Sequence, residues 1–138
     1  MASGSERGSI IIHSTSSNKV EYRADNVFAE GVYGLCYLPN GSGLVACGWH
    51  NDLEEDVDDY NGDDSYGILK VFSPSLELVQ TMTTTFGVEC VTVSPSGSHL
   101  ASGGWGNMII WSESGEGGEW TRVQVLEDHT SYIWAVCF

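Results

Sequence analysis

Short apolar runs alternate along the whole chain with clusters of glycine, proline, asparagine and serine. Each run is three to seven residues long, which suits a β-strand and is too short for most helices. The turns Pro39-Asn40-Gly41 and Pro95-Ser96-Gly97 pair a proline that fixes φ with a glycine that adopts positive φ. The pattern predicts an all-β chain with strands in Ile10–Ile12, Val20–Tyr22, Val32–Leu38, Leu44–Cys47, Ile68–Phe72, Leu76–Met82, Val88–Val93, Met108–Trp111, Trp120–Leu126 and Ile133–Phe138.

Residues 32–51 and 88–107 are two copies of one sequence. Moving the first copy by 56 positions onto the second makes eight of the twenty positions identical without a gap. Beyond this match, Phe72 corresponds to Trp111 at a separation of 39, so the first copy carries 17 extra residues around 51–66. A repeat of about forty residues with four short strands is typical of a β-propeller blade.

The two ends of the chain read as parts of a blade. Residues 1–13 align with 100–111, which contain the second and third strands of a repeat, and 133–138 align with 88–93, the first strand. We therefore expect a partial β-propeller of four-stranded antiparallel blades within one unit, 1–138. Its expected segments are a split blade 1–28 and 129–138, a blade 29–85 with an insertion at 51–66, and a blade 86–128.

The sequences HLASGGWGNMIIW and VLEDHTSYIWAVCF resemble the WD-repeat (β-transducin-like) propeller family. In that family a His, a Ser or Thr, an Asp and a Trp form a buried hydrogen-bonded tetrad. The resemblance implies such structural positions for Ser102, Trp111 and His129, although the three do not all belong to one blade. Thr84 stands at the His position of the second copy and Gly106 at the Asp position, so no complete tetrad is expected.

The resemblance implies a protein-interaction or assembly scaffold without chemistry of its own. The four histidines, at positions 13, 50, 99 and 129, are accompanied by no nucleophile elbow, HExxH motif or phosphate-binding glycine loop, so we expect no enzyme activity. The partner would be another protein held at a loop edge or at the central mouth of a ring. Residues 117–138 are also similar to blades of the cytosolic iron–sulfur assembly WD-repeat adaptors.

A ring of three blades would be too tight at its centre and would leave sheet edges unpaired. One expectation is that two chains exchange terminal strands and form a closed homo-oligomer such as a six-bladed dimer. The alternative is that the chain is a fragment, or half of a larger propeller completed by a different chain.

Charge narrows the choice of partners. Five basic residues against nineteen acidic ones give a net charge of −14, which disfavours nucleic acid and favours a cationic partner or ion. The sequence lacks a membrane-length apolar run and a signal-peptide pattern, so we expect an intracellular protein, cytoplasmic or nuclear, without membrane contact. The four cysteines, at positions 36, 47, 90 and 137, form no CxxC pair and are expected to be reduced core thiols.

Eight of the nineteen acidic residues lie in the insertion. Asp59, Asn61 and Asp63 place oxygen ligands at alternate positions beside Gly62, which resembles the start of an integrin-type FG-GAP calcium loop and, more distantly, an EF-hand. One hypothesis is therefore a calcium-binding propeller module with these three ligands and no other cofactor. The alternatives are a disordered, solvated acidic loop or an electrostatic docking arm.

Trp49 and Trp105 occupy equivalent positions in the two copies, near the end of the second strand. Tryptophan is enriched in binding hot spots, so both residues are candidates for a partner-binding surface. The alternative is that they pack between blades.

Overall fold

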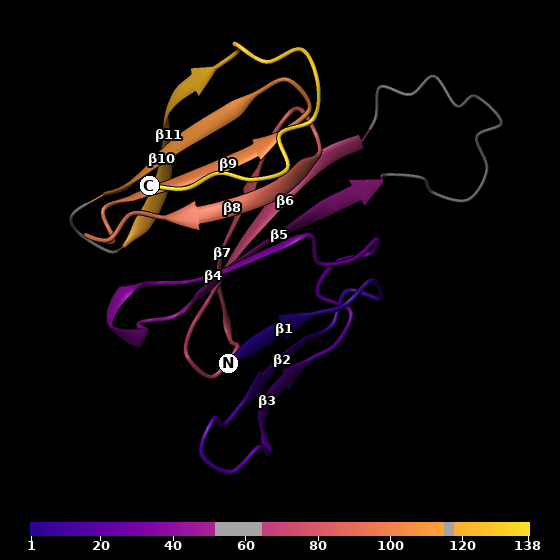
Figure 1. The fold of residues 1–138 in the computed structure, drawn as a ribbon, viewed down its shortest axis with the longest axis vertical. Coiled ribbons are helices and arrows are strands. Elements are labelled where there is room, and N and C mark those ends of the chain that lie inside the picture. The colour runs from indigo at the N-terminus through magenta and orange to yellow at the C-terminus, as the bar shows by residue number, and fades with distance from the viewer. Residues whose placement is uncertain (52–64, 115–117) are drawn as a thin grey trace, which may run out of the picture.

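The computed structural model describes residues 1–51, 65–114 and 118–138, and these residues form three antiparallel sheets (Figure 1). One short 3-10 turn, Pro39–Gly41, accompanies the strands, and the described residues contain no helix long and apolar enough to cross a membrane. The prediction of an all-β chain is confirmed.

The N-terminal sheet contains β1 (Ala2–Gly4), β2 (Ile10–His13) and β3 (Val20–Ala24). The middle sheet contains β4 (Gly34–Tyr37), β5 (Leu44–Asn51), β6 (Ser65–Phe72) and β7 (Leu78–Thr83). The C-terminal sheet contains β8 (Val88–Val93), β9 (His99–Gly104), β10 (Met108–Ser114) and β11 (Glu119–Leu126).

Strand register repeats from sheet to sheet. Tyr37 pairs with Leu44 in the middle sheet, and the residues 56 positions later, Val93 and Leu100, pair in the C-terminal sheet. A register shift immediately precedes His13 in β2, and equivalent shifts precede Phe72 in β6 and Trp111 in β10. These three positions are therefore equivalent, and one sequence pattern builds each sheet.

The core consists of two layers of apolar side chains between neighbouring sheets. Ile10, Phe28 and Phe72 belong to the layer between the N-terminal and middle sheets. Leu69 and Trp111 belong to the layer between the middle and C-terminal sheets. Figure 1 shows the middle sheet between the C-terminal sheet above it and the N-terminal sheet below it, an order that neighbouring propeller blades also have.

One polar side chain connects the outer strands of two sheets. The Gln80 side chain of β7 donates from Nε2 to the Trp120 carbonyl at 2.9 Å and accepts from the Trp120 N–H at 2.8 Å. Both backbone groups of Trp120 in β11 are thus bonded across the junction. Such paired bonds fix the relative positions of β7 and β11, which apolar contacts alone leave free to slide.

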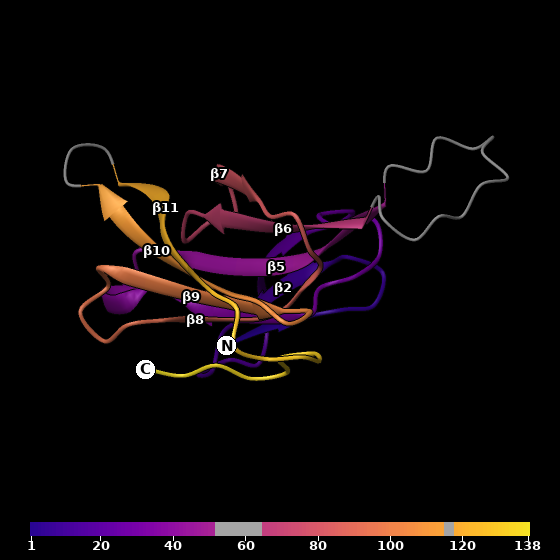
Figure 2. The ribbon, with the colours of Figure 1, turned by 90° about the horizontal axis from the view of Figure 1, so that it is seen from above.

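The expectation of a strand at Ile133–Phe138 is wrong for the single chain. This segment forms no strand, and Figures 1 and 2 show it running beside β8 and β9. It is held by the Ile133 N–H, which donates to the Gly104 carbonyl at 2.9 Å, and by the Cys90 Sγ–H, which donates to the Ile133 carbonyl at 3.3 Å. The physical reason is that a strand needs a hydrogen-bonded edge, and the three-stranded N-terminal sheet lies elsewhere in the molecule. The propeller ring is therefore not closed.

Candidate functional site

Two of the three tetrad-like residues form a buried pair. The Trp111 indole on β10 donates from Nε1 to Ser102 Oγ on β9 at 2.9 Å, and the two residues are only 4% and 0% exposed. His129, by contrast, is exposed in the segment after β11. Thr84, at the expected His position, is buried and donates from Oγ1 to the Gly67 and Phe86 carbonyls. The Ser102–Trp111 pair is therefore a structural part of the core, because the indole N–H and the serine hydroxyl satisfy each other's hydrogen bonding.

Trp49 packs at the junction between the middle and C-terminal sheets. It is half-buried, its ring stacks on Tyr33 at a centroid separation of 6.0 Å, and it lies directly against Gly87. Its indole Nε1 is buried without a hydrogen bond of normal geometry among the described residues. The nearby acceptor is Glu89 of β8: burial raises the pKa of this carboxyl group, and the Trp49 indole opposes the shift.

Trp105 is arranged differently from its counterpart. It is 54% exposed, and its ring meets the Tyr132 ring edge to face at a centroid separation of 4.6 Å. The Tyr132 ring in turn lies 5.3 Å from the Trp134 ring, measured between centroids. The backbone of Trp105 also forms an isolated antiparallel bridge with Tyr132. We call Trp105, Tyr132 and Trp134 the aromatic cluster. Of the two tryptophans selected from the sequence, Trp105 is therefore the one that lies on an exposed surface.

Tyr132 and Trp134 were not predicted as surface residues from the sequence, although the alignment contained the signal. When 133–138 is placed on 88–93, Tyr132 takes the position of Gly87 and Trp134 takes the position of Glu89. At the first junction a glycine allows Trp49 to lie flat, because a Cβ at Gly87 would fall 2.5 Å from the indole. At the second junction, where the C-terminal sheet meets the segment after β11, Tyr132 stands at the position of Gly87. Trp105 and Tyr132 therefore meet edge to face, and more of the Trp105 surface is exposed.

Lys70 is engaged inside the fold. It lines a groove of about 360 Å³ with Arg7, Asn26 and Phe28 between the N-terminal and middle sheets. Lys70 Nζ donates to the Val27 carbonyl and lies 5.0 Å from the centroid of the Phe28 ring. Burial lowers its pKa, since the charged form loses hydration. Lys70 therefore anchors the segment that leads from β3 to β4, because its ammonium group is bound to the Val27 carbonyl and lies over the Phe28 ring.

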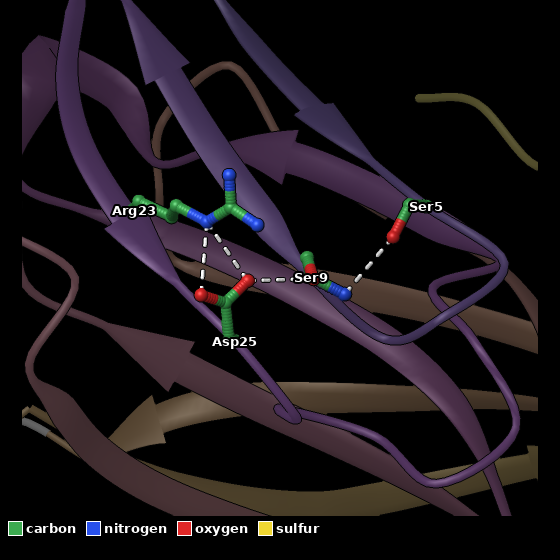
Figure 3. A network of polar contacts seen from close by, with 4 residues as sticks. All are labelled: Ser5, Ser9, Arg23 and Asp25. Carbon is green, nitrogen blue, oxygen red and sulfur yellow. Dashed lines mark hydrogen bonds and ion pairs between the residues drawn. The ribbon is translucent and has the colours of Figure 1, made fainter.

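A polar cluster of Ser5, Ser9, Arg23 and Asp25 lies on the surface of the N-terminal sheet (Figure 3). Arg23 Nε donates to both oxygens of Asp25 at 2.9 Å, Ser9 Oγ donates to Asp25 at 2.8 Å, and the Ser9 N–H donates to Ser5 Oγ at 3.1 Å. These bonds to Arg23 and Ser9 lower the pKa of Asp25. Because both side chains of the ion pair are about half exposed, solvent screens the pair and it contributes little to stability.

The cysteines differ in accessibility. Cys47 and Cys90 are buried, Cys36 is half-buried and Cys137 is exposed, and none forms a disulfide. Burial raises the pKa of the Cys47 and Cys90 thiols, so their thiolate forms are disfavoured at neutral pH. The expectation of core thiols is therefore wrong for Cys137, which is exposed in the C-terminal segment that belongs to no strand.

We predict that iodoacetamide at about pH 8 alkylates Cys137 in the native protein and leaves Cys47 and Cys90 unmodified, because alkylation needs an accessible thiolate. Peptide mass spectrometry after timed quenching measures each site. Unfolding in urea is the control and should make all four cysteines reactive. Labelling of native Cys47 as fast as Cys137 would contradict the buried arrangement.

The proposed calcium ligands Asp59, Asn61 and Asp63 lie outside the described residues. Within the described residues, no three His, Cys, Asp or Glu side chains are grouped so that they could hold a metal ion. The calcium hypothesis therefore stays a prediction from the sequence.

Comparison with known proteins gives one family match and clear structural relatives. Residues 76–112 match the family model "WD domain, G-beta repeat". No curated protein sequence matches the chain. The RRP9 WD40 repeats have a similar structure with a TM-score of 0.72 at 14% identity, covering 95% of this chain and 36% of that one. The Dos1 propeller has a TM-score of 0.62 at 19% identity, covering 91% of this chain and 29% of that one.

The chain therefore spans about a third of the length of these solved structures. Sequence identities of 14% and 19% show a shared fold and nothing further. The similarity of residues 117–138 to iron–sulfur assembly adaptors therefore stays a prediction from the sequence. Residues 76–112, which contain β7 to β9 and part of β10, match one WD40 repeat model, and the chain as a whole shares the fold of solved β-propellers.

Proposed function

We propose that this chain is a non-catalytic, protein-binding scaffold that completes its propeller by exchanging strands with a second copy. One observation carries the proposal: the N-terminal sheet has three strands, whereas each of the other sheets has four. The missing strand would pair with β1, at the edge where β4 and β8 stand in the other sheets. The segment 133–138 has the sequence of such a strand and no sheet of its own.

The equivalence of the sheets gives the register of the exchange. In the C-terminal sheet, Thr92 pairs with Ala101. Cys137 aligns with Thr92 and Ala2 aligns with Ala101, so Cys137 of one copy would face Ala2 of the other. Two such junctions would close a ring of six blades and cover both β1 edges, which would otherwise invite uncontrolled pairing.

We predict that the Ala2→Cys variant forms a disulfide-linked dimer through the native Cys137. Residues facing each other on antiparallel strands have Cα atoms about 4.5–5.5 Å apart, within the range of a disulfide. Mild oxidation followed by non-reducing electrophoresis measures the link, and light scattering after gel filtration measures the native mass of the wild type. We expect a dimer in both experiments.

Two variants serve as controls for the cross-link. Ala2→Cys combined with Cys137→Ser lacks one thiol of the predicted pair, and Ser3→Cys places a thiol on the opposite face of β1. Neither should link efficiently. A monomeric wild type together with equal linking by Ala2→Cys and Ser3→Cys would overturn strand exchange and favour the second candidate, a propeller completed by a different chain. That candidate is supported by the one-third coverage of the solved propellers.

A further inference from the structure

We propose that the aromatic cluster of Trp105, Tyr132 and Trp134 is a docking site for an arginine- or lysine-rich segment of a partner protein. The inference rests on the scaffold part of the proposed function and does not require strand exchange. Its basis is the geometry of the three rings together with the charge of the surrounding chain.

The rings form a continuous surface instead of a core. Tyr132 contacts both tryptophans, with centroid separations of 4.6 Å and 5.3 Å. Trp105 and Trp134 are 54% and 70% exposed, whereas the core residue Trp111 is 4% exposed. Clustered exposed tryptophans expose much apolar area to water, and such residues dominate the energy of protein interfaces when a partner covers them.

The second junction differs chemically from the first at this place. Gly87 and Glu89 at the first junction are replaced by Tyr132 and Trp134 at the second, which adds two aromatic rings and removes the carboxylate. Core packing does not need these rings, because Ile133 alone lies buried against Gly103. The aromatic side chains on either side of Ile133 are therefore free to contact a ligand.

Charge selects the kind of partner. Residues 71–138 contain seven acidic residues and a single basic one, Arg122, and the whole chain carries a net charge of −14. Glu127 and Asp128 are exposed in the segment that leads to the cluster. A negative field attracts cationic segments, and Trp and Tyr ring faces bind guanidinium and ammonium groups through cation–π contacts.

The test measures binding of an acetylated and amidated fluorescent peptide of alternating arginine and glycine to the full chain. A peptide in which glutamine replaces arginine is the uncharged control. We expect Trp134→Ala to weaken binding of the arginine peptide about tenfold, as hot-spot tryptophans do. The matched control variant is Tyr22→Ala, which removes another exposed aromatic ring, on β3, and should leave the affinity unchanged.

Repeating the binding measurement at high salt separates long-range charge attraction from contacts with the rings. Salt screens the charge attraction, whereas the ring contacts persist. Equal affinities of the wild type, Trp134→Ala and Tyr22→Ala would overturn the inference and assign binding to net charge alone. No binding of the arginine peptide, or equal binding of the glutamine peptide, would also overturn it. If Trp134→Ala instead changes only the native mass, the cluster is a contact between copies. Peptide binding by a monomeric wild type would retain this inference while strand exchange fails.

Discussion

Trp111→Ala is expected to lower the free energy of unfolding by about 3–5 kcal/mol, the usual loss for a large buried aromatic side chain. Trp111 lies in the layer between the middle and C-terminal sheets, so its removal leaves a cavity that both sheets line. It also leaves Ser102 Oγ, which is fully buried, without its indole donor. Urea unfolding followed by circular dichroism at one fixed chain concentration measures the change.

Two further variants separate the contributions at this site. Trp111→Phe keeps most of the ring and removes the N–H, so we expect a loss of about 1–2 kcal/mol. Trp134→Ala removes a tryptophan that is mostly exposed, and we expect a change within about 0.5 kcal/mol. Equal destabilisation by the alanine variants at positions 111 and 134 would contradict the distinction between core and surface tryptophans.

Much of the fold was predictable because the chain repeats itself. The 56-residue offset that aligns Pro39 with Pro95 also relates the strand pairs of two sheets. Val88–Val93 was predicted with the bounds that β8 has, since a proline turn and glycines delimit it on both sides. Turn residues of this kind act locally, so a sequence pattern contains them in full.

The remaining features depend on contacts between distant segments. Ile133–Phe138 has an apolar sequence similar to β8, yet it forms no strand, because strand formation depends on an available edge that the segment cannot itself provide. Trp49 and Trp105 occupy equivalent positions in the alignment but have different neighbours, because Tyr33 and Gly87 lie against Trp49 and Tyr132 lies against Trp105. Periodicity cannot detect a difference created by a neighbour in another segment.

The candidate site followed the same rule. Ser102 and Trp111 were predictable as a pair because they lie on adjacent strands of one repeat. His129 lies exposed because the segment after β11 belongs to no sheet in the single chain. The Ser102–Trp111 contact thus lies within one repeat, whereas the surroundings of Trp49, Trp105 and His129 depend on neighbouring segments and required the structure.

Gly104→Ala is expected to destabilise the chain by about 3 kcal/mol, at the upper end of overpacking effects. A Cβ at this end of β9 would fall 1.8 Å from the Gly87 carbonyl oxygen, so the backbone entering β8 would have to move. The backbone of Gly104 also accepts the hydrogen bond from Ile133 that positions the C-terminal segment. The substitution should therefore also weaken binding of the arginine peptide, while urea unfolding measures the loss of stability.

The matched control for steric conflict is Gly41→Ala, whose Cβ would meet no atom within 4 Å. Gly41 has a φ of +68°, so alanine there costs about 1 kcal/mol of backbone strain without any clash. Because Gly41 lies in the turn before β5, far along the chain from Ile133, its substitution should leave peptide binding unchanged. If the two variants lose equal stability and bind the peptide equally well, close approach at Gly104 does not position the aromatic cluster. A loss of both stability and binding confined to Gly104→Ala would connect the packing of the last sheet directly to the docking site beside it.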